Sequence, residues 1–279
     1  MLRLRATTEI VTTVWRRAIL DAFVAPRRFE VSVREFWRAS NRLFHSGIEN
    51  MDLSNLPGSE QHIRLLASSW SIGAMPPQDL YALMRIVRWI EPATIFEIGT
   101  FTGRTTAHLA LNSDARIYTL DMPREMASGI ENYTSGDLSL LQPREEIGTT
   151  YRAFEESHRI HQLFGDSRTF DYTPYRGRMD LVLVDGCHLY DGVLRDSRSA
   201  FDMIRPGGVI VWHDFSNLYD VTRAVRFLAV QHSIFHVEGT SLAVHMRKAQ
   251  EHKANAVKCS EAFPGPATAD AAQHRDSAG

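Results

Sequence analysis

The stretch that decides the fold is TIFEIGTFTGR, residues 94–104. It begins with a short apolar run that is typical of a buried strand, and a loop that carries Gly99 and Gly103 follows. A helix is expected next, over about 104–111, and then a second strand that ends in Asp121. In an open parallel sheet, ligands bind beyond the carboxyl ends of the strands, where such a loop lets the backbone approach them. The stretch therefore predicts a ligand site at this loop.

The apolar pattern on either side of this stretch alternates between helix and strand periodicity. The expected amphipathic helices are 80–90, 189–204 and 221–228. The expected further strands are 116–120, 162–164, 181–184 and 209–212, with a closing hairpin over 234–246. This order predicts an α/β fold in which a doubly wound, mostly parallel sheet ends in an antiparallel hairpin.

The chain has 279 residues, 44% of them hydrophobic, and its 31 Lys and Arg residues nearly balance 33 Asp and Glu residues. This composition excludes a disordered chain, a coiled coil and a disulfide-dense miniprotein. A net charge of −2 gives no broad attraction to nucleic acid, so small molecules are the expected partners. Cys187 and Cys259 are too few for a disulfide framework or a cysteine zinc site, and no apolar run predicts a signal peptide or a membrane span. A cytoplasmic protein without a membrane partner is expected.

Three segments of unequal character divide the chain. Residues 1–75 show helix-like patches, notably over 31–44, and are expected to form a helical extension that serves as a lid or as a contact between two copies. Residues 76–248 are expected to form the ligand-binding domain. Residues 249–279 are expected to be a disordered tail, because the last thirty contain only Val257 and Phe263 among branched or aromatic apolar residues.

The loop and the acid that follows it carry two signals about the ligand. A dinucleotide-binding loop needs a glycine where this chain has Phe101, so a dinucleotide is disfavoured. Asp121 lies 22 residues after Gly99, where a carboxylate can accept hydrogen bonds from both hydroxyls of a ribose. The alternative is that Gly99 and Gly103 are ordinary turn glycines.

Four motifs carry a resemblance to a known family. They are EIGTFTG at 97–103, GDS at 165–167, DGCH at 185–188 and RPGGVIVWHD at 205–214. The first resembles the opening motif of class I S-adenosylmethionine (SAM)-dependent methyltransferases, and its aromatic residue is similar to that of the catechol- and caffeoyl-CoA-type O-methyltransferases. The whole set is similar to the bacterial macrocin-type O-methyltransferases and spans roughly 77–248. The resemblance implies a Rossmann-like sheet of seven strands, with SAM as the methyl donor.

The resemblance also implies which residues bind SAM. Glu97 and Gly99 would hold its methionine end, and Asp121 would hold the ribose. Asp166 with Ser167 would contact the adenine edge. The full set of implied cofactor-binding residues is Glu97, Gly99, Thr100, Phe101, Gly103, Asp121, Gly165, Asp166, Ser167 and Asp185. A plain loop-capping carboxylate is the alternative role of Asp166.

Two acids and a histidine follow two apolar strands. Asp185 follows the strand over 181–184, and His213 with Asp214 follows the strand over 209–212. Carboxylates suit Mg²⁺ or Mn²⁺, an imidazole suits Mn²⁺, Fe²⁺ or Zn²⁺, and such an ion would lower the pKa of a substrate hydroxyl. By resemblance to the metal-dependent O-methyltransferases, these three residues are the expected ligands, although that family has Asp-Asn or two acids in place of His213-Asp214. The alternative is that the acids cap helices or bind cofactor and acceptor without an ion.

His188 lies three residues after Asp185, at a position that carries a catalytic lysine in the catechol type. A neutral imidazole there could take the proton of the acceptor, so His188 and Asp185 are the expected catalytic residues and His213 is the second choice of base. A SAM-dependent O-methyltransferase is therefore predicted, acting on a small hydroxylated acceptor such as a sugar, a polyketide or a phenol, with nitrogen acceptors left open. The alternatives are a catalytically silent cofactor-binding module and, less favoured, a nucleotide-cofactor oxidoreductase.

Overall fold

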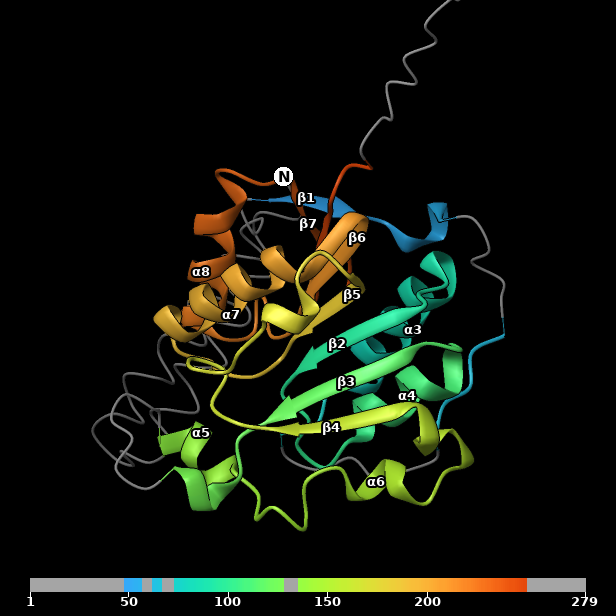
Figure 1. The fold of residues 1–279 in the computed structure, drawn as a ribbon. Coiled ribbons are helices and arrows are strands. Elements are labelled where there is room, and N and C mark those ends of the chain that lie inside the picture. Colours follow the sequence, from blue (N-terminus) through green and yellow to red (C-terminus); the bar gives the residue numbers. More distant parts are fainter. Residues whose placement is uncertain (1–47, 57–61, 67–72, 128–134, 250–279) are drawn as a thin grey trace, which may run out of the picture. The chain divides into compact units, whose positions relative to one another are not determined.

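The computed structural model describes residues 48–56, 62–66, 73–127 and 135–249 (Figure 1). The helix expected over 31–44 lies outside these residues, and so does the tail expected over 249–279 except for its first residue. Within them, helices and strands alternate along the chain, as predicted. None of the described helices is both long enough and apolar enough to cross a membrane.

The described residues form one sheet of eight strands. The strands are β1 (Glu49–Met51), β2 (Thr94–Ile98), β3 (Arg116–Asp121), β4 (Ile160–Phe164), β5 (Met179–Val184), β6 (Ile204–Trp212), β7 (Ile234–Val237) and β8 (Ala243–Met246). Their order across the sheet is β1-β7-β8-β6-β5-β2-β3-β4. Only β8 runs antiparallel to its neighbours, and every other pair is parallel. The predicted α/β class, the mostly parallel sheet and the antiparallel hairpin are confirmed, with one strand more than the seven expected.

The extra strand, β1, comes from the extension that we expected to be helical. Residues 49–51 pair in parallel with residues 235–237 of β7, at the edge of the sheet. Glu49 and Asn50 are exposed, so the alternation of apolar and polar residues that marks a half-buried strand is missing. β1 forms because the edge of β7 offers unpaired backbone groups, which the local sequence does not show.

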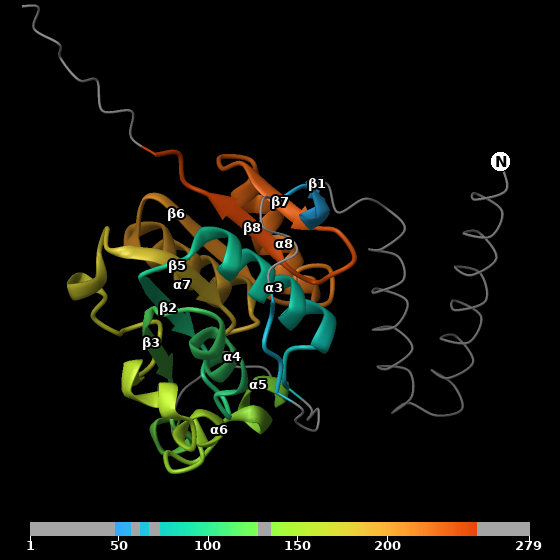
Figure 2. The ribbon, with the colours of Figure 1, turned by 90° about the vertical axis from the view of Figure 1, so that its right-hand side faces the viewer.

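Two pairs of helices cover the two faces of the sheet (Figures 1 and 2). The helices α3 (Pro77–Ile90) and α4 (Arg104–Asn112) pack on one face, and α7 (Tyr190–Met203) and α8 (Tyr219–Ala229) pack on the other. In the central strand β5, Leu181 and Leu183 join the first core while Val182 and Val184 join the second, because successive side chains point to opposite faces. Both faces of β5 are buried, which explains its uninterrupted apolar sequence.

The remaining helical segments are short. They are η1 (Leu53–Asn55), η2 (Arg124–Met126), α5 (Ser135–Leu140), α6 (Thr149–Arg152), η3 (Glu155–Arg159) and η4 (Thr173–Tyr175). The strands β2, β3, β5 and β6 are parallel to one another, so their carboxyl ends meet at one edge of the sheet. The residues that follow these four strands define the site described next.

Candidate active site

The loop between β2 and α4 follows a path that its glycines permit. Gly99 has a φ of +101°, and a Cβ atom there would lie 2.0 Å from the backbone oxygen of Asp185. Gly103, with a φ of +80°, immediately precedes α4. Phe101 has a φ of +51°, which is uncommon for a bulky residue. The loop and the end of β5 therefore lie in direct contact and line one site. Only glycine at position 99 permits this close approach.

A second segment holds this loop from another side. The backbone N–H groups of Gly148 and Thr150 donate to the carbonyl oxygens of Phe101 and Thr102, each at 2.9 Å. These residues lie just before and at the start of α6. The backbone of the loop is therefore fixed by a segment that no sequence motif had marked.

Asp121, the last residue of β3, is bound to the same loop. Its Oδ2 accepts a hydrogen bond from the backbone N–H of Phe101, and its Oδ1 accepts one from Met122 at 2.7 Å. Burial raises the pKa of Asp121 to about 6, although these backbone donors favour the ionised form. At neutral pH, Asp121 is mainly a carboxylate beside the glycine loop.

Glu97 of β2 is fully buried below the loop. Its Oε2 accepts hydrogen bonds from the hydroxyls of Thr106 and Thr119, at 2.6 and 2.5 Å. Its Oε1 has no hydrogen-bond partner among the described residues. Burial raises the pKa of Glu97 to about 8, and the two hydroxyls offset this only in part. Glu97 is thus mainly protonated at neutral pH, with one oxygen left for a further partner.

The segment after β4 contains Gly165, Asp166 and Ser167. The N–H of Gly165 donates to the backbone oxygen of Asp121 at 2.9 Å, which places this segment beside the end of β3. Arg168 binds the carboxylate of Asp166 through Nη2 at 2.6 Å and through Nε at 2.9 and 3.0 Å. Burial disfavours the ionised form of Asp166, but the hydrogen bonds from Arg168 outweigh it and lower the pKa of this carboxyl. The charge of Asp166 is therefore already paired within its own segment.

The carboxyl ends of β5 and β6 bring Asp185 together with His213 and Asp214. Nδ1 of His213 lies 2.8 Å from Oδ1 of Asp185 and 3.4 Å from Oδ2 of Asp214. Asp214 has a φ of +58°, a left-handed conformation that costs a residue with a Cβ atom about 1–2 kcal/mol. Such strained residues are frequent at functional sites, where the surrounding fold holds them in place.

A fourth residue, Asp79 in the first turn of α3, lies on the other side of His213. Nε2 of His213 is 3.4 Å from Oδ2 of Asp79, and both side chains are almost completely buried. Burial disfavours a charged imidazole, but the carboxylates of Asp185 and Asp214 outweigh it and raise the pKa of His213 well above its ordinary value. His213 is therefore a buried imidazolium that faces three carboxylates.

His188 faces Asp214 from the loop that follows β5. Its Nε2 lies 3.4 Å from Oδ2 of Asp214, and both side chains are about one-fifth exposed. Burial disfavours the ionised form of Asp214, but His213 and then His188 outweigh it and hold its pKa well below the usual range. Asp214 therefore stays a carboxylate at neutral pH and can orient the ring of His188.

A divalent ion fits one group of side chains at this edge. One ligand atom from each of Asp185, His188 and Asp214 lies within 4.8 Å of the others, and two carboxylates with an imidazole form a donor set for Mn²⁺, Fe²⁺ or Zn²⁺. His213, which we expected as a ligand, is placed differently, because its two nitrogens face Asp185 and Asp79. His188, which we expected as the base, is the imidazole that completes the group.

Three buried residues of this region were not predicted from the sequence: Asp79, Asp196 and Ser241. Burial raises the pKa of Asp196, which lies in α7, to about 7. Ser241 donates its N–H to Oδ1 of Asp79 at 3.1 Å, although the two residues are 162 positions apart. Asp79 lies where an acid is expected to complement the dipole of a helix, so its position gave no reason to place it at a site.

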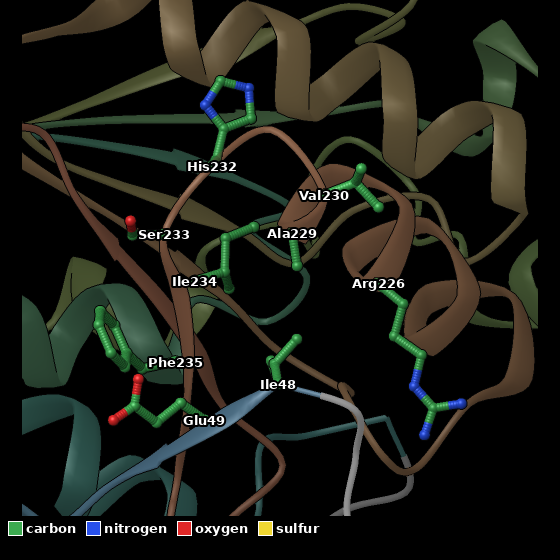
Figure 3. A pocket seen from close by; sticks show the side chains of 9 residues that line it. All are labelled: Ile48, Glu49, Arg226, Ala229, Val230, His232, Ser233, Ile234 and Phe235. Carbon is green, nitrogen blue, oxygen red and sulfur yellow. The ribbon is translucent and has the colours of Figure 1, made fainter.

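Figure 3 shows a separate hollow of about 450 Å³. It lies at the end of the sheet opposite to the edge that carries Asp214. Its lining comes from β1, the end of α8 and the start of β7, and includes Glu49, Arg226 and His232. Because β7 runs in the same direction as β6, the start of β7 points away from the end that carries Asp214. The hollow shares no residue with the group of Asp185, His188 and Asp214.

Known proteins resemble the part of the chain that carries the carboxyl edge of the sheet. Residues 96–215 match a family model that is described as a methyltransferase domain. Residues 96–215 are thus similar to a methyltransferase domain. The matched range includes the glycine loop, Asp121, Asp185, His188 and Asp214, whereas Asp79 and Ser241 lie outside it.

Several solved structures also resemble the chain around this matched range. The O-methyltransferase TomG from Streptomyces achromogenes, in complex with SAM, is 21% identical, and the match covers 77% of this chain and 99% of that one with a TM-score of 0.44. An O-methyltransferase from Bacillus cereus in complex with S-adenosylhomocysteine (SAH) is 16% identical over 63% of this chain and 84% of that one, with a TM-score of 0.43. The SAH-bound methyltransferase PaMTH1 from Podospora anserina is 15% identical over 63% and 80%, with a TM-score of 0.46. Among curated proteins, none matches the chain.

Proposed function

We propose that the methyltransferase domain transfers the methyl group of SAM to a hydroxyl oxygen of a small molecule. The observation that carries this proposal is the pairing of His188 with the ionised Asp214, next to Asp185 and at the same sheet edge as the glycine loop. This arrangement supports a base that lies next to the loop where the donor would bind. The resemblance of residues 77–248 to small-molecule O-methyltransferases supports the same class of acceptor.

The residues around the loop fit the methyl donor. The backbone N–H groups at the start of α4 can bind the carboxylate of the methionine end. Oε1 of Glu97 can accept a hydrogen bond from the ammonium group of the same end, because that cation would favour the ionised form of the carboxyl, which burial alone disfavours. The carboxylate of Asp121 accepts backbone hydrogen bonds from the loop and from Met122, and its oxygens can also accept from a ribose hydroxyl.

The chemical task left to the chain is to orient the acceptor and to remove its proton, because the sulfonium of SAM supplies an activated methyl group. Nε2 of His188 faces the carboxylate of Asp214, so the tautomer with its proton on Nε2 is favoured. Nδ1 is then the ring nitrogen that would take up the proton of a substrate hydroxyl. Asp214 stabilises the imidazolium formed in that step. Asp185, which lies beside both residues, is placed to hold the hydroxyl itself.

A divalent ion would be held by Asp185, His188 and Asp214. There it would lower the pKa of a bound hydroxyl. Because the ion and the proton would use the same imidazole, a metal-assisted reaction and a reaction with His188 as the base are alternatives at this site. We favour His188 as the base, since Asp214 already faces its Nε2.

The acceptor class and the location complete the proposal. A hydroxyl on a sugar, a polyketide or a phenol could give up its proton to His188. The low cysteine content supports a cytoplasmic location, and a contact between two copies through the extension of residues 1–75 belongs to the proposal as well.

Calorimetry with SAH tests the donor. We expect the wild type to bind SAH and Asp121→Ala to bind it at least tenfold more weakly, because the ribose hydroxyls lose their acceptor. A wild type that binds no SAH would refute the proposal, and so would unchanged binding by the variant.

Methyl transfer from labelled SAM to a panel of hydroxylated metabolites tests the reaction. Once an acceptor is found, single-turnover transfer by His188→Ala is expected to be 10²- to 10⁴-fold slower than by the wild type. A near wild-type rate would remove His188 as the base. Activity lost on treatment with EDTA and restored by Mn²⁺ would favour the metal-assisted alternative. Tight SAH binding with no transfer to any acceptor would favour a catalytically silent module.

A further inference from the structure

Asp79 is a buried acid that the proposed mechanism does not use. Its carboxylate is inaccessible to solvent, although the first turn of a helix is usually exposed. The backbone N–H and the hydroxyl of Ser241 both donate to it. Nε2 of His213 is a further polar neighbour, at 3.4 Å from Oδ2.

These contacts form a continuous path to the catalytic edge. Ser241 fixes the carboxylate of Asp79, which faces Nε2 of His213. Nδ1 of the same ring donates to Oδ1 of Asp185 at 2.8 Å. One oxygen of Asp185 is thus held by the ring, so the orientation of the ring decides where the other oxygen lies.

A purely structural role accounts poorly for this arrangement. Anchoring α3 to the sheet needs no charge, because well-packed apolar residues of similar volume stabilise a buried position as well as an ion pair or better. α3 already packs on the sheet through apolar side chains such as Leu80, Leu83 and Val87. A buried acid that faces one nitrogen of a ring, while the other nitrogen binds a catalytic carboxylate, instead resembles the outer residues that orient the ligands of a metal or the groups of a catalytic triad.

We propose that Asp79 is a positioning residue that acts through His213 to fix the carboxylate of Asp185, with Ser241 holding Asp79 in place. The inference rests on the proposed function for the role of Asp185, but the path of contacts exists independently of it. Both Asp79 and Ser241 lie outside residues 96–215, so the match to the methyltransferase domain does not include them.

The experiment uses the full chain with ¹⁵N-labelled histidine and follows the proton on Nδ1 of His213 by NMR. Asp185→Asn identifies this signal, because the variant changes the acceptor of the hydrogen bond. Asp79→Asn keeps the size of the side chain and removes its charge. Ser241→Ala is the milder variant, since it removes only the hydroxyl and keeps the backbone donor. Asp180→Asn is the matched control, because Asp180 is also a hydrogen-bonded acid but lies at the opposite end of β5, bound to Thr94 and Arg205.

We expect the Nδ1 proton signal of His213 to shift or to be lost in Asp79→Asn, and to shift less in Ser241→Ala. In Asp180→Asn it should stay at its wild-type position. An unchanged signal in both Asp79→Asn and Ser241→Ala would overturn the inference. A shift of the same size in the control would also overturn it, because the effect would then be one of general destabilisation.

Binding and turnover separate this inference from the proposed function. Asp79→Asn should bind SAH within twofold of the wild type, while its kcat with an identified acceptor should fall 10- to 100-fold, with the KM for SAM nearly unchanged. An equal loss of kcat in Asp180→Asn would contradict a positioning role. If the wild type binds no SAH, the proposed function fails, and the NMR result still decides whether Asp79 controls the ring of His213.

Discussion

Glu97 allows a quantitative test of the site, because its burial makes the stability of the protein depend on pH. The side chain is fully buried, and burial raises its pKa from the ordinary 4.5 to about 8. The folded state therefore holds the proton of Glu97 more tightly than the unfolded state does. This contribution to stability is complete below pH 4.5 and is lost as the pH rises through about 8.

The magnitude follows from the two pKa values. One pKa unit corresponds to about 1.4 kcal/mol, so a group with these values lowers the free energy of unfolding by about 4 kcal/mol between pH 5 and pH 9. Glu97→Gln removes the titration, and its side-chain oxygen can still accept hydrogen bonds from Thr106 and Thr119. The variant should therefore match the wild type near pH 5 and exceed its stability by a few kcal/mol at pH 9.

Urea unfolding of both proteins at intervals from pH 5 to pH 9 measures this difference. Asp121 and Asp196 also have pKa values raised by burial, to about 6 and about 7, but they are present in both proteins and cancel in the comparison. Parallel stability profiles for the two proteins would refute the reasoning, because they would show that Glu97 titrates alike in the folded and unfolded states.

Gly99→Ala tests a close contact at the site, and Asp180→Asn tests hydrogen bonds at the opposite end of the sheet. Gly99→Ala should lower the free energy of unfolding by more than about 3 kcal/mol, because it combines a φ of +101° with a Cβ atom 2.0 Å from the oxygen of Asp185, and it should weaken SAH binding. Gly239→Ala is its matched control in thermal unfolding, because Gly239 has a φ of +78° but open space around it. A cost in the free energy of unfolding of about 1–2 kcal/mol is expected there. Equal costs at the two positions would contradict the role of the close contact. Asp180→Asn should lower the free energy of unfolding by about 1–3 kcal/mol, because it weakens the hydrogen bonds to Thr94 and Arg205. The affinity for SAH should stay unchanged. A loss of this affinity would show that the amino end of the sheet influences the site.

Much of the fold was predictable because its signals are local. The apolar run of β5 and the glycines after β2 report burial and backbone geometry over a few residues, so the α/β class and the order of most strands could be inferred. β1 could not be inferred, because residues 49–51 lack an apolar pattern and pair only where the edge of β7 is available.

The candidate site divides in the same way. The positions of Asp121, Asp185 and Asp214 at strand ends follow from the sequence, because each ends a strand of recognisable pattern or follows one within two residues. The sequence does not show which acid each of the two histidines faces. His188 and His213 both lie near the same acids in the sequence, and only the structure shows that His213 turns toward Asp79 while His188 faces Asp214.

The sequence by itself thus determined the parallel sheet, its glycine loop and the edge at which polar residues gather, since periodicity and glycine geometry act over short distances along the chain. Only the tertiary structure decided the partners of these residues. Asp79 and Ser241 meet across 162 positions because α3 packs on the sheet beside the loop between β7 and β8. Their electrostatic interactions and hydrogen bonds become strong only when that packing excludes water from them. No local sequence pattern indicates this exclusion.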